Sequence, residues 1–353
     1  MDGAPVGQNP RMNNSQRLRR RLLAAGLLWP LRSLTAQTAT APGTVWRVGA
    51  GKPISRIADA VQRAADGDTI EIEPGVYAGD VAVIHQRRLS LVGLGSGPQD
   101  RPRLVAAGKH AEGKAIWVVR NGDIRVTNLH FEGARVADRN GAGIRFEKGH
   151  LRLTQCSFMD NQNGVLTGND IDSKLTIKDS DFGEAPTNPG SLPHLLYVGR
   201  IGQVGIHGSR FRAGHEGHLI KSRARRTSLL GNVLDDGPTG QASYEIDLPE
   251  GGEALIEDNT VVQSAGTQNT VMLAYGAEHP NWPLNQLTLR RNTFINRLPS
   301  GGWFVRVWSD RLPAGVDVLS QGNRYLGPGS LLLGPGGRSM DDRRGPVPPA
   351  GPA

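Results

Sequence analysis

The amino-acid sequence predicts an all-β solenoid, in which short parallel strands wind into successive coils. A phrase with apolar or small residues at offsets 0, 2, 5 and 7 occurs ten times along the 353 residues. Its starts are 19 to 35 residues apart, a spacing typical of solenoids, whose repeats bury their apolar faces against neighbouring repeats. Glycine is frequent (47 residues) and aromatic residues make up only 5%, as in turn-rich, aliphatic-cored β proteins. The phrases start at Ile70, Leu89, Ile124, Leu151, Leu175, Val204, Thr227, Ala254, Leu287 and Val318.

Residues 1–41 predict an export segment that precedes the fold. Basic residues at 17–21 come before a short apolar run at 22–29 and a small-residue stretch at 33–41, which is the order of a signal peptide. The apolar run is shorter than the about 20 residues that a membrane-spanning helix needs. We therefore expect an exported protein, periplasmic or secreted, that is not membrane-spanning. The arginines at 19–21 also fit a twin-arginine signal, so the export route stays open.

Residues 55–65 predict a short helix that caps the first coil, because Ile57, Val61 and Ala65 have helical spacing. The phrase G-D-T-I-E-I-E-P-G-V-Y follows at residues 67–77. A short helix followed by this phrase resembles the N-terminal entry to right-handed parallel β-helix proteins of the pectate-lyase-like superfamily. The resemblance implies a right-handed, single-stranded parallel β-helix of about ten coils over residues 42–333, and it does not specify the substrate.

Each coil is predicted to contain two strands. The phrase alternates with period two, as strands do, and a second strand-like run lies between phrases, for example at 195–198 and 219–222. Leucine-rich repeats are the main competing solenoid, and no helix fits within these coils. Offset 5 is often serine or asparagine, which predicts a ladder of hydrogen-bonded side chains, and Cys156 falls at this offset as a buried thiol. The Pro/Gly-rich residues 334–353 predict a disordered tail.

The net charge of +8 does not predict a nucleic-acid-binding protein. Residues 1–41 contain six arginines, so the body of the chain is near neutral and lacks the broad basic face that phosphate backbones require. A single cysteine rules out an intramolecular disulfide. We expect a monomer whose partner is a polysaccharide.

Candidate site residues emerge when the second strand-like runs of neighbouring coils are aligned. If Leu196, Ile220 and Ile246 face the core, their neighbours point outward in one row, because side chains alternate along a strand. This row contains Tyr197, Lys221 and Asp247. A second outward row contains Leu195, Leu219 and Glu245, and a column of His194, His218 and Tyr244 is predicted to point inward. Further candidates are Arg223 beside Lys221, His215 in the preceding turn, Arg145 on a preceding coil, and Tyr275 and Glu278 on the following one.

This row suits chemistry on uronate sugars. β-Elimination removes a proton beside a carboxylate, which requires a base and a cation that neutralises the developing negative charge. Lyases that the chain resembles use lysine or arginine in these roles, often with calcium, so the catalytic candidates are Lys221, Arg223, Asp247 and His218. Arg223 would lower the pKa of Lys221 and Asp247 would raise it, which leaves the net direction open. The competing interpretation of Lys221 and Asp247 is a surface ion pair.

The remaining candidates carry weaker signals. Calcium is a candidate cofactor, but Asp170 and Asp172 lack a recognised ligand spacing, and a structural role is favoured. Trp282 lies in a long insertion, where it is either a sugar-stacking platform or a loop anchor. The chain lacks the W-x-D-H and R-x-P-x-x-R patterns of pectate lyases, which weakens a pectin assignment. The stretches at 217–224 and 243–252 resemble a group of bacterial β-helix proteins without implying an activity.

Three functions follow as hypotheses. The first is a polysaccharide lyase or epimerase that acts on an acidic, uronate-containing polysaccharide. The second is a glycoside hydrolase that uses Asp247 with Glu245 or Glu278 as its acid and base. The third is a non-catalytic polysaccharide-binding or cell-envelope protein, because fold alone does not imply function.

Overall fold

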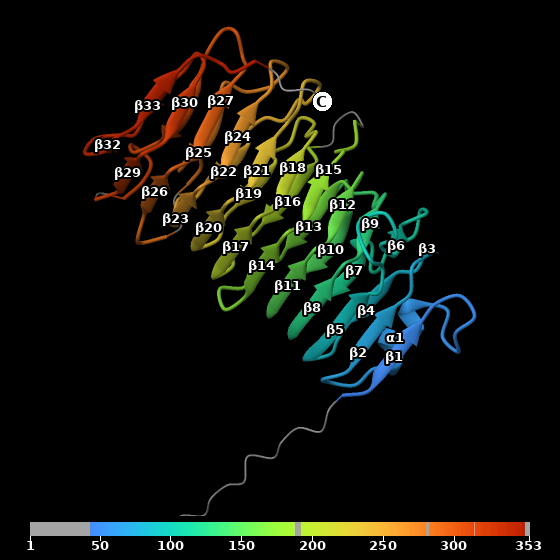
Figure 1. Cartoon of the computed structure of the whole chain (residues 1–353). Coiled ribbons are helices and arrows are strands. Elements are labelled where there is room, and N and C mark those ends of the chain that lie inside the picture. The colour runs from blue at the N-terminus through green and yellow to red at the C-terminus, as the bar shows by residue number, and fades with distance from the viewer. Residues whose placement is uncertain (1–42, 188–191, 280–281, 314, 350–353) are drawn as a thin grey trace, which may run out of the picture. The chain divides into compact units, whose positions relative to one another are not determined.

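Three parallel sheets make up the chain in the computed structural model, which describes residues 43–187, 192–279, 282–313 and 315–349 (Figure 1). From residue 69 onward each sheet takes every third described strand, so the chain visits the three sheets in turn and completes about eleven coils. The structure confirms the predicted right-handed parallel β-helix, as expected for parallel strands with right-handed crossovers. The predicted export segment, residues 1–41, lies outside the described residues.

We name the sheets A, B and C in the order in which one coil visits them. Sheet A contains β1 (Val45–Val48), β2 (Thr69–Ile72), β5 (Arg88–Gly93), β8 (Asp123–Thr127), β11 (His150–Thr154), β14 (Lys174–Lys178), β17 (Gln203–His207), β20 (Arg226–Leu230), β23 (Glu253–Glu257), β26 (Gln286–Arg290), β29 (Asp317–Gln321) and β32 (Arg338–Met340). Sheet B contains β3 (Val76–Ala78), β6 (Arg103–Val105), β9 (His130–Glu132), β12 (Ser157–Met159), β15 (Asp181–Gly183), β18 (Arg210–Arg212), β21 (Val233–Asp235), β24 (Thr260–Gln263), β27 (Thr293–Asn296), β30 (Arg324–Leu326) and β33 (Arg343–Gly345). Sheet C contains β4 (Ala82–Ile84), β7 (Ala115–Val119), β10 (Ala142–Phe146), β13 (Asn163–Thr167), β16 (His194–Val198), β19 (Ile220–Ser222), β22 (Ile246–Leu248), β25 (Val271–Tyr275), β28 (Trp303–Val307) and β31 (Ser330–Leu332).

The prediction of two strands per coil is wrong, because the repeated phrase spans two strands and not one. Offsets 0 and 2 lie in sheet A and offset 7 lies in sheet B, with a sharp bend between them. The residue at offset 4 has a positive φ in eight successive coils, which turns the chain from one sheet to the next. These bend residues are Asn128, Gln155, Asp179, Gly208, Gly231, Asp258, Arg291 and Gly322. The prediction also misplaced Ser96, which is exposed, because Leu104 occupies the corresponding core position.

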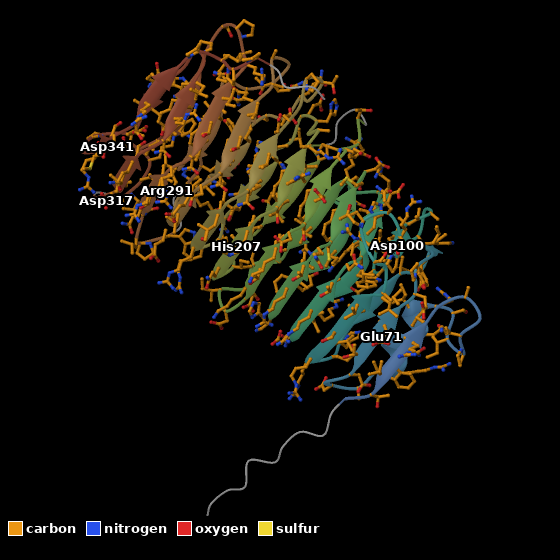
Figure 2. All side chains as sticks on the ribbon, in the orientation of Figure 1. Glu71, Asp100, His207, Arg291, Asp317 and Asp341 are labelled. Carbon is orange, nitrogen blue, oxygen red and sulfur yellow. The ribbon has the colours of Figure 1, made fainter. Side chains whose placement is uncertain are left out.

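The core confirms the ladder predicted at offset 5. The ladder begins at Cys156, whose backbone N–H donates to the side-chain oxygen of Ser180. From there each side-chain oxygen accepts the backbone N–H of its counterpart on the preceding coil, at 2.8–3.1 Å, through Ser180, Ser209, Asn232, Asn259, Asn292 and Asn323. Burial raises the pKa of the Cys156 thiol to about 11, so this cysteine is an unreactive core residue. Beside the ladder, Phe131, Phe158, Phe182 and Phe211 stack with ring centroids 4.7–5.0 Å apart. Charged residues such as Arg291, Asp317 and Asp341 lie on the outer surface (Figure 2).

The two ends of the described solenoid are built differently. The helix α1 (Ile57–Arg63) covers the first coil, and the carboxylate of Asp80 accepts the amides of Ile57 and Ala58 at 2.6 and 2.9 Å. At the other end, β32 and β33 continue sheets A and B, where composition predicted a disordered tail from residue 334. The fold extends past the predicted boundary because Asp342 ends the ladder by accepting the amide of Asn323 at 2.7 Å. The described residues contain no helix long and apolar enough to cross a membrane.

Candidate functional site

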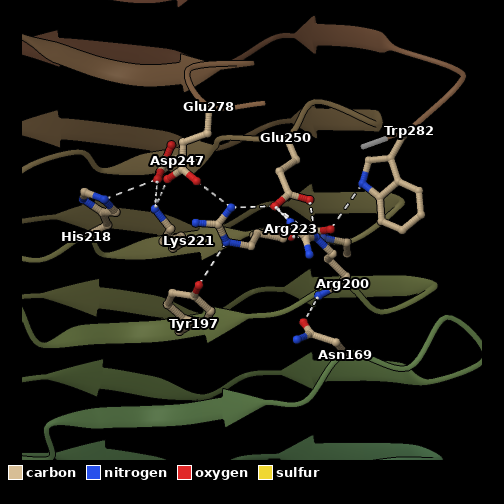
Figure 3. A network of polar contacts seen from close by, with 12 residues as sticks. Asn169, Tyr197, Arg200, His218, Lys221, Arg223, Asp247, Glu250, Glu278 and Trp282 are labelled. Atoms are coloured by element: carbon tan, nitrogen blue, oxygen red, sulfur yellow. Dashed lines mark hydrogen bonds and ion pairs between the residues drawn. The ribbon is translucent and has the colours of Figure 1, made fainter. Parts of the chain in front are cut away.

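The outer face of sheet C carries the row that the alternating pattern predicted. Tyr197, Lys221 and Asp247 are partners in register on β16, β19 and β22. Their neighbours Leu196, Ile220 and Ile246 are buried in the core, as the alternation requires. The three outward residues therefore lie on successive coils about 4.8 Å apart. Figure 3 shows the network of polar contacts that grows from this row.

Lys221 is held between two carboxylates. Its Nζ donates to Oδ2 of Asp247 at 2.7 Å and to Oε1 of Glu278 at 3.0 Å, and its side chain is only 9% exposed. Burial disfavours the charge, but Asp247 and Glu278 outweigh it and raise the pKa of Lys221. This is the direction that the sequence left open. Lys221 is therefore an ammonium cation at neutral pH, which suits it to hold carboxylates in place and not to act as a base.

His218 orients Asp247 from the other side. Its Nδ1 accepts the backbone N–H of Tyr244 at 3.2 Å, so in the neutral ring Nε2 carries the proton and donates it to Oδ2 of Asp247 at 3.3 Å. Burial raises the pKa of Asp247, but His218 and Lys221 outweigh it, and the pKa is lowered. Asp247 is thus a carboxylate, and its Oδ1 is buried and accepts no hydrogen bond from the described residues.

The sequence predicted that His194, His218 and Tyr244 point into the core. This prediction is wrong. The three rings lie beside one another with centroids 4.8 and 4.9 Å apart and planes tilted by 37° and 31°, and His218 reaches Asp247 on the outer face. The prediction failed because His218 and Tyr244 precede β19 and β22, outside the regular alternation of the strands. Burial lowers the pKa of His194 well below its ordinary value, so its imidazole is neutral.

Arg223 occupies the centre of the network. Its Nε donates to the hydroxyl oxygen of Tyr197 at 2.9 Å, and one terminal nitrogen lies 2.6 Å from both Glu250 and Glu278 (Figure 3). Burial opposes the charge of Arg223, but the bonds to Glu278 and Tyr197 outweigh it, and the pKa is raised. The guanidinium is therefore a fixed cation at every relevant pH.

Sequence reasoning missed Arg200 and Glu250. Glu250 is 1% exposed, and it accepts a bidentate pair of hydrogen bonds from Arg200 at 2.8 Å besides the contact with Arg223. Burial raises the pKa of Glu250, but Arg200 and Arg223 outweigh it, and the pKa is lowered. The aligned stretches were residues 194–199, 218–223 and 244–249, and Arg200 and Glu250 lie one position beyond the first and the third, in turns from sheet C to sheet A. An alignment longer by one residue would have included both as candidates without fixing where their side chains point.

Two adjoining hollows open over this network. The larger, of about 820 Å³, is lined by Asp138, Arg139, Asn140, Arg145, Asn163, Leu166, Thr167, Asn169, Leu192, His194, Tyr197, Arg200, Arg223 and Glu278. The smaller, of about 660 Å³, is lined by Arg200, Arg223, Glu250, Glu278, His279 and Arg311. They share Arg200, Arg223 and Glu278, so we treat them as one groove. Arginines outnumber carboxylates in its lining, which favours an anionic ligand.

Arg145 lies in this groove as predicted, as do His194, Tyr197, Arg223 and Glu278, whereas the other seven candidates do not line it. Lys221, Asp247, His218 and Tyr244 lie beside the groove, outside its lining. Glu245, Tyr275 and His215 are also outside it.

Glu245 is fully buried, because Leu195 and Leu219 of its predicted outward row belong to the core. Burial and Asp236 raise the pKa of Glu245 well above its ordinary value, and neither carboxyl oxygen has a partner among the described residues. Tyr275 is also buried, since the register places Ala274 beside Asp247, and its hydroxyl donates to the carbonyl of Gly252. His215 pairs with Gln241, and its ring lies 3.9 Å from the carboxylate of Glu216.

Trp282 is a loop anchor. Its indole nitrogen donates to the carbonyl of Arg223 at 3.2 Å, which ties the insertion after β25 to the site. Asp170 forms an ion pair with Lys148 at 2.9 Å and accepts the amide of Asp172. Within the described ranges no group of three or more histidine, cysteine or acidic residues could hold a metal ion.

Comparisons with known proteins concern the fold. Two crystal structures of the pectin methylesterase from Aspergillus niger match with a TM-score of 0.47 and 12% identity, covering 78% of this chain and 93% of theirs. The ORF18 protein of Geobacillus virus E2 matches with a TM-score of 0.45 and 10% identity, covering 80% of this chain and 52% of its own. No protein-family model matches the sequence, and no curated protein is similar to it. The fold assignment rests on the three sheets of this chain.

Proposed function

We propose that the protein is a lyase or epimerase that acts on an acidic, uronate-containing polysaccharide in the groove on sheet C. The supporting observation is the contact between Arg223 and Tyr197 in the lining of this groove, 2.9 Å from nitrogen to hydroxyl oxygen. It places a permanent cation beside a group that can transfer a proton. These are the two requirements of chemistry beside a carboxylate. Export of the protein, predicted from residues 1–41, belongs to the same proposal.

Arginines in the groove would neutralise the substrate carboxylate. Removing the proton beside a uronate carboxylate leaves an enolate-like anion, whose charge must be stabilised. Arg223 and Arg200 are fixed by Glu250, and Arg145 by Glu147 at 3.2 Å, so their donors are preorganised for a planar carboxylate. Preorganised donors act without reorganisation at the moment of reaction.

Tyr197 is the proton-transfer group that the geometry favours. Lys221 is a cation enclosed by carboxylates, and His218 uses both ring nitrogens within the protein. The Tyr197 hydroxyl accepts from Arg223, and in the contacts among described residues it donates to no acceptor. Lys221, His218 and Asp247 then position the charged network around Tyr197 and Arg223.

The two reactions share their first step. A base takes the proton beside the carboxylate. In a lyase the glycosidic C–O bond then breaks, the leaving oxygen takes up a proton, and a carbon–carbon double bond forms. In an epimerase the same carbon regains a proton on its opposite face, and the chain stays intact.

The test is incubation of purified protein with alginate, pectate, glycosaminoglycans and bacterial exopolysaccharides. A lyase gives an unsaturated product that absorbs in the ultraviolet, and an epimerase incorporates deuterium from D₂O without cleaving the polymer. We expect Tyr197→Phe and Arg223→Met to abolish either signal, while Arg125→Met, an exposed residue on β8 of sheet A, leaves it unchanged. Turnover by Tyr197→Phe at the wild-type rate would refute the assignment of Tyr197.

The two other hypotheses predict different results. A glycoside hydrolase would release reducing ends without ultraviolet absorbance, but it needs a general acid whose pKa is raised. Burial raises the pKa of both Asp247 and Glu278, yet Lys221 and the neighbouring charges outweigh it and lower both, and Glu245 lies outside the groove. A polysaccharide-binding protein would bind these polymers and turn none of them over.

A further inference from the structure

Arg306 on β28 is a cation that lacks a carboxylate partner among the described residues. Its guanidinium carbon lies 4.5 Å from the ring centre of Trp308 and 6.0 Å from that of Trp303. All three side chains are half-buried. The Nε of Arg306 is buried and has no hydrogen-bond partner there. By contrast, Arg200, Lys221 and Arg223 each contact at least one carboxylate.

This cluster belongs to the outer face that carries the groove. Asp247 pairs in register with Ala274 on β25, and Ala274 pairs with Arg306 on β28. Arg306 therefore lies two strands beyond Asp247 in the same outward row, roughly 10 Å along the solenoid axis. On the groove side of this row, Tyr244 packs beside His218 with ring centroids 4.9 Å apart.

Arg225 is likewise half-buried without a carboxylate partner among the described residues, but only Arg306 lies beside two indole rings there. Burying a charge costs free energy unless a partner compensates it. The two tryptophan rings hold Arg306 by cation–π contact and leave its donors for another acceptor. Indole faces are also suitable stacking surfaces for sugar rings. The charge of Arg306 and the two indole rings beside it together favour an acidic sugar as the ligand.

We propose that Trp303, Arg306 and Trp308 form a distal subsite that binds the carboxylate or sulfate group of a further acidic sugar unit. This inference rests on the proposed function, since it assigns the subsite to the same polysaccharide. The row from Arg145 to Arg306 crosses six strand-to-strand steps, roughly 29 Å. Only an oligosaccharide of several units, lying along the axis, reaches from the central groove to Arg306.

The test measures binding as a function of ligand length. The probes are size-fractionated oligomers of polygalacturonate, alginate and chondroitin sulfate, with dextran as the uncharged control, titrated by calorimetry. The variants are Arg306→Met, Arg306→Lys and the matched control Arg125→Met, each checked for folding by thermal unfolding. Alginate tests a carboxylate alone, and chondroitin sulfate adds the sulfate.

We expect Arg306→Met to raise the Kd for long oligomers by about tenfold or more, because a hydrogen bond from a charged donor is lost. Short oligomers should bind as they do to the wild type, Arg306→Lys should lose less affinity, and Arg125→Met should lose none. Equal affinity of Arg306→Met and wild type at every length would overturn the subsite.

Separate variants distinguish the two proposals. If Arg306→Met binds normally while Arg223→Met loses binding and turnover, the subsite is wrong and the proposed function stands. If Arg306→Met loses affinity for long oligomers while the wild type turns over no polymer, the subsite stands and the enzymatic proposal fails. If the wild type binds none of the charged probes, both proposals are wrong.

Discussion

The Nζ of Lys221 lies 2.7 Å from Oδ2 of Asp247, and this ion pair is almost completely shielded from solvent. Removing one member of a buried pair leaves the other charge uncompensated, which typically costs about 3–5 kcal/mol. We therefore expect Lys221→Met to lower the free energy of unfolding by an amount in this range. Denaturant titration measures it, with Lys174→Met on the exposed face of β14 as the control. Equal losses in the two variants would show that the pair contributes little.

Asp247 should contribute to the loss of unfolding free energy at acidic pH. Its folded pKa is lowered despite burial, so its contribution is present above the unfolded pKa and is lost as pH falls through the folded pKa. We expect Asp247→Asn to be less stable than wild type at neutral pH and to approach it at low pH. Urea unfolding between about pH 2 and pH 7 measures both curves. A constant gap between the curves would contradict the linkage.

Glu245 should have the opposite pH dependence. Burial and Asp236 raise its folded pKa, so the folded state retains a proton that the unfolded chain loses above its ordinary pKa. The wild type therefore loses stability as pH rises toward the folded pKa. We expect Glu245→Gln to gain relative stability by up to about 1.4 kcal/mol per pH unit in this range. Glu71→Gln, on β2 of sheet A, is the control, and a pH-independent difference would disprove the protonated state.

Glu250 should matter for turnover more than for substrate binding. Its carboxylate fixes both Arg200 and Arg223, and small displacements of positioning groups reduce rates by about a hundredfold. Once a substrate is identified, we expect Glu250→Gln to lower kcat by about tenfold or more and to change KM less. Glu253→Gln, which breaks an exposed ion pair with Arg226 on sheet A, is the matched control. A loss confined to KM would assign Glu250 to binding.

Alternation along strands explains which site residues the sequence predicted. Tyr197, Lys221 and Asp247 lie inside strands, where period two fixes the direction of a side chain. His218 and Glu245 precede their strands, and Arg200 and Glu250 follow them, so alternation does not determine where they point. Their positions depend on the path of the turns, and residues in turns do not follow the period-two alternation that can be read from a sequence.

The bend between sheets A and B was missed for a related reason. A left-handed backbone conformation is usually signalled by glycine or asparagine, but here Gln155 and Arg291 also adopt it. Packing on both sides favours this bend. The ladder residue at offset 5 directly follows it, and stacked Phe side chains at offset 7 lie in the core behind sheet B. Only the repeated shift from offsets 0 and 2 to offsets 5 and 7 marked it in the sequence.

The ladder has a direction, and Asp342 is its terminator. Each side chain accepts a hydrogen bond from the backbone N–H of the coil before it. An incomplete last coil would therefore leave the backbone N–H of Asn323 without its acceptor. A chain cut after residue 333 would lose β32 and β33 and present open edges in sheets A and B. Residues 338–345 thus complete the ladder, because without them the amide of Asn323 and the edges of β29 and β30 would lose their partners.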